Sequence, residues 1–237
     1  MAWRSAGLLA GWLFGACCCA LSNAAAAGEE LEQARNRQDR AALERILAER
    51  TRMAERKPGD AAAQAAVAEA ASYLTEVALE LGDRDGARSV AETGIRAAER
   101  AVALAPKVAE YHRLLGALCG QTIPGNVLLA VRYGKCAAES IQRAIELDPQ
   151  SWRAWLSRGV GHYYLPLAFG GGVEKAIEDF RKALQLNPRA ADAWLWLGIA
   201  LRKAQRNAEA RQALLKSLEL NPERVWARRQ LEKTPGQ

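Results

Sequence analysis

The sequence predicts an all-α protein built as a solenoid of antiparallel helical hairpins. Small and large apolar residues recur at helical spacings, most clearly between residues 187 and 222. Half of the 237 residues are hydrophobic but only 6% are aromatic, which is typical of helices packed through Ala, Leu and Gly. The chain lacks the alternation of apolar and polar residues expected of strands. Repeated hairpins account for these observations, because each one buries its apolar face against the next.

The unit that starts at Ala191 defines the repeat. Counted from that residue, it places large apolar side chains at positions 4, 7, 11 and 24, small residues at 8, 20 and 27, and proline at 32: Trp194, Leu197, Leu201, Leu214, Gly198, Ala210, Ser217 and Pro222. This pattern resembles the tetratricopeptide repeat (TPR), a helix–turn–helix unit of 34 residues. The resemblance implies a right-handed solenoid whose small residues lie where helices cross closely.

Two earlier units, starting at Trp152 and Ala109, carry the same signatures but are longer. The Trp152 unit has 39 residues and the Ala109 unit has 43. Because the two helical signatures of each unit are individually in register, the extra residues must lie at the turn inside each hairpin. We therefore expect internal insertions within residues 121–135 and 165–172.

The remaining segments extend the solenoid at both ends. A first unit has a long second helix, for which Asp85 is a candidate N-cap. The predicted TPR domain spans residues 60–222. Its units cover about 60–108, 109–151, 152–190 and 191–224, with a degenerate helical hairpin at 28–59 before them and a capping helix and tail at 223–237 behind them.

Residues 1–27 differ from the rest of the chain. Arg4 is followed by an apolar run and then by small residues, as in a secretory signal peptide. Cleavage after Ala24 or Ala27 fits the small-residue rule. The alternatives are a retained membrane anchor and lipidation at Cys17. We therefore expect an exported protein, periplasmic or secreted, with an envelope-anchored form as the alternative.

Beyond this segment the chain has two cysteines, Cys119 and Cys136, which flank the longer insertion. Residues equidistant from the turn of a hairpin face one another, so a disulfide is geometrically feasible in an oxidising compartment. The alternative is a pair of small, buried free thiols. No histidine accompanies the pair at a metal-binding spacing, so we expect no metal.

The sequence gives no catalytic residues and no cofactor motif, and we expect a protein that is not an enzyme. His112 and His162 fall at positions that the repeat fills with packing residues. The stretch 170–172 is Gly-Gly-Gly, but neither a strand nor a phosphate-loop lysine accompanies it. A tight turn or hinge is the better interpretation.

The TPR resemblance also implies a concave groove lined by the first helix of each unit, at positions 2, 5, 9, 12 and 13. Carried over to this chain, the partner-binding candidates are Arg113, Arg153, Leu156, Val160, Tyr163, Tyr164, Leu195, Ile199, Arg202 and Lys203. Aromatic and arginine side chains are frequent interface anchors. The alternative is that several of these residues, especially Leu156 and Leu195, only contact the neighbouring repeat.

The two insertions should project along one edge of the solenoid. We expect them to form a lip over the groove that adds Tyr133 and Phe169 to the binding surface. The alternative is that they only lengthen their hairpins.

Charge narrows the class of partner. The net charge is +6, and residues 181–237 alone carry +7. Together with the expected export, this positive charge favours a protein or peptide partner over nucleic acid. An acidic partner would complement the charge. Membrane association is expected only if the N-terminal segment is retained or Cys17 is lipidated.

The order of regular and enlarged units is similar to that of exported bacterial TPR proteins, including components that assist solute uptake. It is more distantly similar to the regulator-of-microtubule-dynamics family. The resemblance implies a non-catalytic adaptor or scaffold in the bacterial envelope. The alternative is a solute- or ligand-binding accessory component of an envelope transport system.

Overall fold

The structure, a computed structural model, describes residues 26–123 and 127–236 and confirms the all-α solenoid. Within these ranges there are helices and turns but no strand. A first helix occupies residues 26–37. It is followed by α2 (Arg40–Arg56), α3 (Ala61–Glu80), α4 (Arg84–Leu104), α5 (Ala109–Gln121), α6 (Val127–Leu147), α7 (Trp152–Tyr164), the short 3-10 helix η1 (Leu167–Phe169), α8 (Val173–Leu186), α9 (Ala191–Lys203), α10 (Asn207–Leu220) and α11 (Val225–Glu232). Cys17 lies outside these ranges, and so does the proposed signal peptide except for residues 26 and 27.

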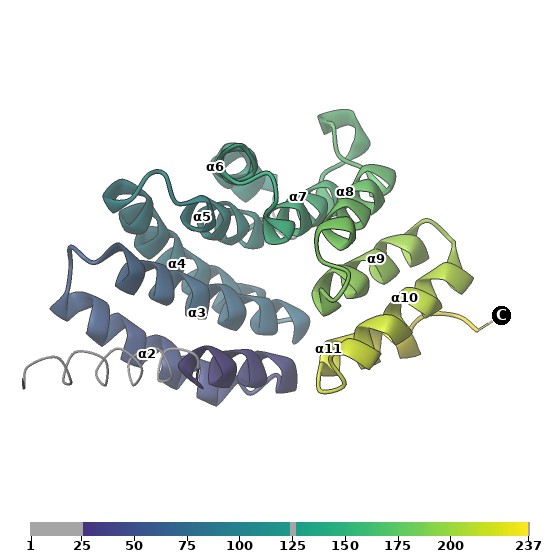
Figure 1. Ribbon diagram of the computed structural model, residues 1–237, viewed down its shortest axis with the longest axis horizontal. Helices are drawn as coiled ribbons and strands as arrows, with labels where there is room; N and C mark the ends of the chain where they lie inside the picture. The colour runs from purple at the N-terminus through teal and green to yellow at the C-terminus, as the bar shows by residue number, and fades with distance from the viewer. Residues whose placement is uncertain (1–25, 124–126, 237) are drawn as a thin grey trace, which may run out of the picture.

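Consecutive helices pair as antiparallel hairpins, and the hairpins stack into a curved array (Figure 1). The first helices α3, α5, α7 and α9 contact one another in turn, and α4, α6, α8 and α10 lie outside them. The inner wall of the array is therefore built from the first helix of each unit, as in the predicted repeat.

The small residues of the repeat allow close helix crossings. A Cβ atom added to Gly159 would lie 2.5 Å from the Phe180 ring, and one added to Gly198 would lie 2.6 Å from Leu214 Cγ. Any larger residue at these positions would separate the two helices of the hairpin. The spacing of small and large residues in the sequence thus sets how tightly each hairpin closes.

Helix starts follow ordinary capping chemistry, with one correction. The α4 helix is capped by Asp83, whose carboxylate accepts a hydrogen bond from the Gly86 amide at 2.9 Å. Asp85, the predicted cap, instead lies in the first turn and pairs with Arg88. The cap lies two residues closer to the N-terminus than predicted. Gly82, with φ +84°, ends α3 in a tight turn, and this turn places Asp83 at the start of α4.

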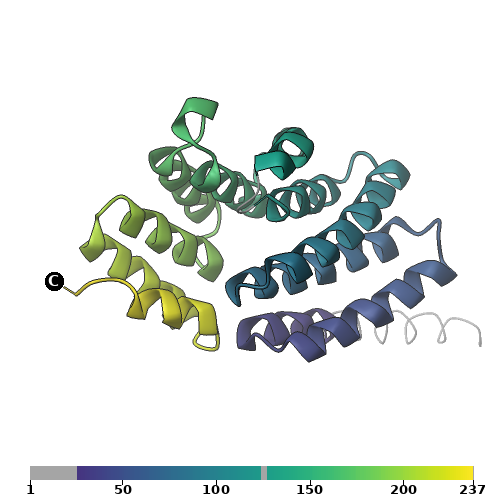
Figure 2. The same ribbon diagram turned by 180° about the vertical axis from the view of Figure 1, so that it is seen from behind.

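The two ends of the array lie side by side. Seen from behind, α11 approaches the first helix, although the two are separated by most of the chain (Figure 2). An ion pair between Arg37 and Glu223, 2.7 Å apart, crosses this boundary. The C-terminal helix therefore does more than cover the last repeat, which is the role expected from the sequence: it also meets the N-terminal hairpin.

Candidate binding surface

The predicted groove residues lie on α5, α7 and α9, but they divide sharply by exposure. Arg153, Tyr164 and Lys203 are exposed, whereas five others are half-buried: Arg113, Leu156, Val160, Tyr163 and Arg202. Leu195 and Ile199 are buried, at 0% and 4% exposure. The inner wall is thus open along α7 and closed along much of α9.

The prediction that Leu195 and Ile199 contact a partner is wrong. Both belong to an apolar cluster with Ala227 of α11, and Trp226 and Leu231 pack against it. The C-terminal helix packs at the end of the stack and buries these two side chains. The repeat pattern could not reveal this, because it describes units in the middle of a solenoid rather than its end.

The cationic side chains of the groove are mostly used inside the molecule. Arg113 donates two hydrogen bonds to Glu110, at 2.8 and 2.6 Å. Arg202 donates to the Gln230 backbone carbonyl at 2.9 Å and side-chain carbonyl at 2.7 Å, which fastens the last turn of α11. These arginines stabilise the fold, so they are poor candidates for contacts to an acidic partner.

Lys203 and Arg153 are also engaged, but with aromatic rings. The Lys203 ammonium lies 4.2 Å from the centroid of the Tyr163 ring and donates to the Tyr163 carbonyl at 2.9 Å. The Arg153 guanidinium lies 4.8 Å from the Trp152 ring. Both remain exposed, so each keeps a face toward solvent.

Aromatic side chains gather where α7, α9 and α11 meet. Tyr164 stands edge-on to Tyr163 and to Trp196, with ring centroids 5.0 and 6.1 Å apart. Trp196 in turn contacts Phe180 and Trp226. Tyr164 is nevertheless 56% exposed. It therefore forms the solvent-facing end of an otherwise packed aromatic group.

The loop that follows Tyr164 presents more apolar surface. Leu167 and Phe169 are 79% and 75% exposed, and Leu165 is 41% exposed. We call Tyr164, Leu165, Leu167 and Phe169 the apolar tip. It continues the aromatic group of the inner wall outward along the edge of the solenoid.

The tip is ordered by its own backbone. The Gly170 amide donates to the Leu167 carbonyl at 2.9 Å, and the Gly172 amide donates to the His162 carbonyl at 2.9 Å. Gly170 and Gly172 have φ values of +86° and +116°, which other residues adopt only with strain. At Gly171 a Cβ would lie 2.1 Å from the Leu165 carbonyl oxygen. The three glycines thus form the tight turn that the sequence predicted.

Tyr133, the other predicted lip residue, is buried instead. Its side chain is 8% exposed and packs in the cluster that joins α3, α4 and α5. Its hydroxyl donates to Glu92 of α4 at 3.2 Å. The prediction failed because most of the 121–135 insertion lengthens α6, and the helix turns Tyr133 toward the core. The apolar spacing of Leu129, Tyr133 and Ala137 was the signal for this.

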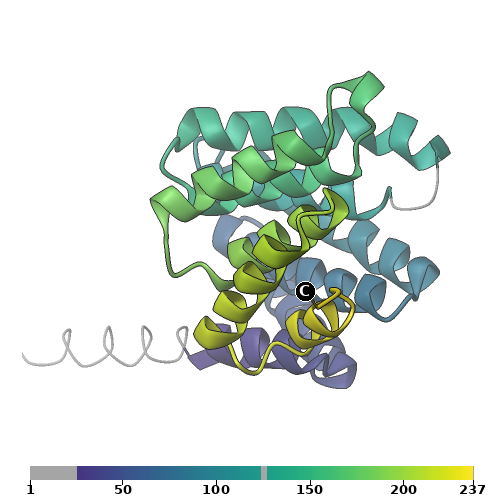
Figure 3. The same ribbon diagram turned by 90° about the vertical axis from the view of Figure 1, so that its right-hand side faces the viewer.

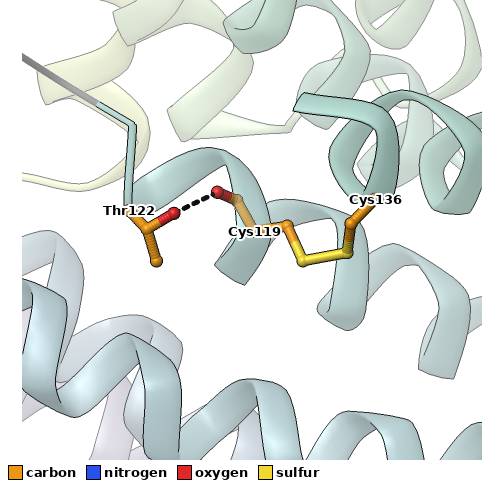
Figure 4. Close-up of a disulfide and its surroundings, with 3 residues drawn as sticks. All are labelled: Cys119, Thr122 and Cys136. Carbon is orange, nitrogen blue, oxygen red and sulfur yellow. Dashed lines mark hydrogen bonds between the residues drawn. A yellow bond between two sulfur atoms is a disulfide. The ribbon is translucent and has the colours of Figure 1, made fainter. Parts of the chain in front are cut away.

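Cys119 of α5 and Cys136 of α6 form a disulfide, with the two Cα atoms 6.1 Å apart (Figure 4). Cys119 is fully buried, and its carbonyl accepts a hydrogen bond from the Thr122 hydroxyl at 2.7 Å. The bond joins the two helices on either side of the longer insertion. Within the described ranges, His, Cys, Asp and Glu side chains form no group that could hold a metal ion.

Both histidines make local structural contacts. His162 Nδ1 lies 2.7 Å from the buried carboxylate of Asp179, which also accepts three hydrogen bonds from Arg158. This group ties α7 to α8 beneath the apolar tip. His112 Nε2 lies 2.9 Å from the Pro106 carbonyl in the preceding connection. The sequence pattern gave no signal for Asp179, since it is one of many acidic residues on an amphipathic helix.

Two hollows lie at the opposite edge of the wall, where the first helices begin. One has a volume of about 510 Å³ and the other about 330 Å³, and both are lined by Trp152 and Arg153. Glu69, Glu110 and Asp148 line the larger hollow, and Arg189 and Asp192 line the smaller. This edge is polar and of mixed charge, in contrast to the apolar tip.

Comparisons with known proteins agree with this architecture. Residues 167–224 match the family described as Tetratricopeptide repeat. The crystal structure of TTC0263, a thermophilic TPR protein from Thermus thermophilus, is similar with a TM-score of 0.61 and 18% identity, covering 82% of this chain and 91% of that one. A weaker similarity, with a TM-score of 0.42 and 20% identity, links 76% of this chain to 96% of YrrB, described as a TPR protein with an unusual peptide-binding site. No curated protein sequence matches the chain. This chain is therefore a helical repeat solenoid whose residues 167–224 carry the tetratricopeptide repeat signature.

Proposed function

We propose that this protein is a non-catalytic adaptor that binds a protein partner through its apolar tip and the adjoining aromatic end of α7. The observation that carries this proposal is the ordered exposure of Leu167 and Phe169, at 79% and 75%. Soluble proteins seldom leave large apolar side chains together on a surface unless that surface makes contacts.

The local backbone supports a binding role for the tip. Four backbone hydrogen bonds within residues 162–172, with donors from Phe169 to Gly172, hold the turn in one shape. The Lys175 ammonium donates to the Gly170 carbonyl at 2.8 Å and fixes the start of α8 against it. A loop that is already ordered loses less conformational entropy on binding, so more of the contact energy appears as affinity.

The chemistry of the tip defines the class of partner. Leu165, Leu167 and Phe169 offer apolar contact, and Tyr164 adds a ring with a polar end. Because Arg113 and Arg202 are engaged internally, charge contributes less to recognition than the sequence suggested. We infer a partner that inserts the tip into an apolar pocket of its own, with Lys203 and Arg153 as peripheral cations.

A binding role rather than catalysis fits the histidine geometry. Arg158 and His162 share the Asp179 carboxylate, and this arrangement joins two helices of one hairpin. The His162 imidazole therefore has a structural role in holding α7 against α8. The neighbouring loop provides the contact surface.

We further propose that the protein works in the cell envelope after export. The N-terminal segment has the pattern of a signal peptide, and the Cys119–Cys136 disulfide suits an oxidising compartment. Among the described residues no helix is both long and apolar enough to span a membrane. N-terminal sequencing of protein recovered from the envelope fraction should give a chain that starts after residue 24 or 27. Recovery of the intact N-terminus from the cytosol would contradict export.

The adaptor role can be tested with one double variant. Leu167→Ser with Phe169→Ser should weaken the affinity for a partner isolated from envelope extract by about 100-fold or more, since central apolar anchors each contribute about 2 kcal/mol. The affinity is measured by calorimetry with the purified partner. Thermal unfolding of the double variant should match that of the wild type, because neither side chain is buried.

A matched control removes an exposed leucine elsewhere. Leu215 on α10 is 52% exposed and lies outside the tip, so Leu215→Ser should keep wild-type affinity. Equal affinity of the tip variant and the wild type would rule out the tip as the contact surface. Equal loss in the tip and control variants would point to a general effect of surface hydrophobicity.

A further inference from the structure

The two ends of the solenoid are joined by a buried group of charges that the repeat pattern does not contain. We call Arg35, Glu76, Glu80, Asp192 and Arg224 the seam cluster. Arg35 belongs to the first helix, Glu76 and Glu80 to α3, Asp192 to α9, and Arg224 immediately precedes α11. The cluster therefore links residues that lie up to 189 positions apart.

Both arginines of the cluster are almost fully buried, at 4% and 1% exposure. Arg224 donates to Glu76 at 2.7 Å and to both carboxylate oxygens of Glu80. Arg35 donates to the two oxygens of Asp192 at 2.8 and 3.2 Å. Each arginine thus reaches a carboxylate on the other side of the boundary between the two ends.

The seam is polar, whereas each end of the solenoid beside it has an apolar cluster of its own. The apolar cluster of the N-terminal hairpin contains residues of the first helix, α2 and α3. The cluster at the other end contains residues of α9, α10 and α11, with Tyr163 of α7 packed against it. Among the described residues no apolar cluster includes both ends. Charged and polar contacts therefore dominate this boundary, and because Arg35 and Arg224 are buried, salt screens their contacts much less than those of exposed pairs.

Two hydrogen-bond donors in the seam cluster also lack partners among the described residues. In the described part of the chain, the Nε atoms of Arg35 and Arg224 are buried without a hydrogen-bond partner. Burial, and then the neighbouring charge of Glu76, raise the pKa of Glu80 to about 7 against the opposing effect of Arg224. Burial also opposes ionisation of Asp192, but Arg35 and Arg224 hold its pKa below the usual range. The carboxylates depend on the two arginines, so removing one leaves buried charge uncompensated.

The seam lies beside the aromatic end of the inner wall. Arg224 stands 5.7 Å from the Trp226 ring, which contacts Trp196. The seam is therefore adjacent to Trp226, which belongs to the packed aromatic group of the inner wall.

We propose that the seam cluster is an electrostatic latch that holds the solenoid closed and opens to admit a partner to the inner wall. In the closed form, the first helix and α11 stand side by side, and the charged contacts of Arg35 and Arg224 join α3 to α9. In the open form, the N-terminal hairpin separates from α11 while every apolar cluster stays intact. The latch adds regulation to the proposed adaptor role, but its test requires no partner.

The test measures the distance between the two ends in the full chain. Spin labels carried by a non-cysteine unnatural amino acid at Gln33 and Arg229, both exposed, report this distance by pulsed electron resonance. The wild type at low salt should give one short distance. Arg224→Gln should raise the population of a longer distance about tenfold or more.

Two further variants make the result specific. Arg37→Gln removes an exposed ion pair that crosses the same boundary, and it should leave the distance distribution unchanged because such pairs contribute little. Adding Glu76→Gln and Glu80→Gln to Arg224→Gln should restore part of the closed population, since no uncompensated carboxylate remains. Helical content by circular dichroism verifies that each variant is folded.

If Arg224→Gln fails to fold, the variant Glu76→Gln with Glu80→Gln decides the question; it leaves Arg224 without its two glutamate partners and should populate the long distance. An unchanged single short distance in a folded Arg224→Gln variant would overturn the latch. An open latch together with unchanged partner affinity of the tip variant would overturn the adaptor surface and leave the latch standing.

Discussion

The two insertions occupy the same place in consecutive repeats, yet one is part of the core and the other is a surface. Both project from one edge of the solenoid, at the start of α6 and in the loop that contains η1 (Figure 3). The first insertion lengthens a helix and buries Tyr133, and the disulfide between the two flanking cysteines joins that helix to α5. The second leaves Leu167 and Phe169 in solvent.

The difference follows from local sequence. The first insertion also contains a proline and a glycine, Pro124 and Gly125, but from Val127 on it has helix-forming residues at apolar spacing, so α6 starts there and packs against α4. The second contains Pro166 and three consecutive glycines, which end the helix and form a compact turn. An insertion in a repeat protein therefore becomes core or contact surface according to whether its residues continue the helix.

Removing the disulfide should have the largest effect on stability. Cys119→Ser with Cys136→Ser opens a loop of 17 residues, so the free energy of unfolding should fall by about 3 kcal/mol under the chain-entropy model. Denaturant unfolding of oxidised wild type and of the double variant measures this. Reduced wild type is the control and should unfold at the same denaturant concentration as the variant. An equal unfolding midpoint for oxidised and reduced wild type would show that the disulfide does not stabilise the fold.

Truncating one aromatic residue in each insertion should separate the two roles. Tyr133→Ala should lower the free energy of unfolding by about 2 kcal/mol, because a buried ring and its hydrogen bond to Glu92 are lost. Phe169→Ala should change it by less than about 0.5 kcal/mol, as expected for an exposed side chain. Matched melts of the two variants check the contrast, and similar losses in both would mean that Phe169 packs as Tyr133 does.

A smaller effect is expected at the turn itself. Gly170→Ala places a side chain at φ +86°, which should cost about 1 kcal/mol locally and loosen the tip. Hydrogen exchange at the Gly171 and Gly172 amides should quicken, while the α9 amides stay protected. Gly161→Ala is the control, because a Cβ there meets nothing within 4 Å and the backbone φ is ordinary. Unchanged exchange in Gly170→Ala would mean that the loop does not depend on its glycines.

The sequence was a reliable guide wherever one repeat determines its own packing. The crossing of Gly159 with Phe180 and of Gly198 with Leu214 follows from spacing alone, because both partners lie in one hairpin. The sites of the two insertions follow for the same reason. The position of Phe169 on an exposed loop could also be predicted from the sequence, since proline and glycine mark the turn.

The sequence was a poor guide where distant segments meet. Leu195 and Ile199 occupy groove positions by count, but α11 covers them. Arg202 stands at a groove position and instead binds the end of α11. Tyr133 failed for a different reason, since the number of inserted residues does not say whether they form helix or loop.

By itself, the sequence determined the helices, the hairpins and the order of their stacking, because these depend on apolar spacing over a few tens of residues. Only the tertiary structure decided that the two ends meet and that Arg35 and Arg224 are buried there with carboxylates from α3 and α9. The curvature of the stack sets that meeting, and curvature accumulates from small rotations at every helix contact. No single repeat encodes it.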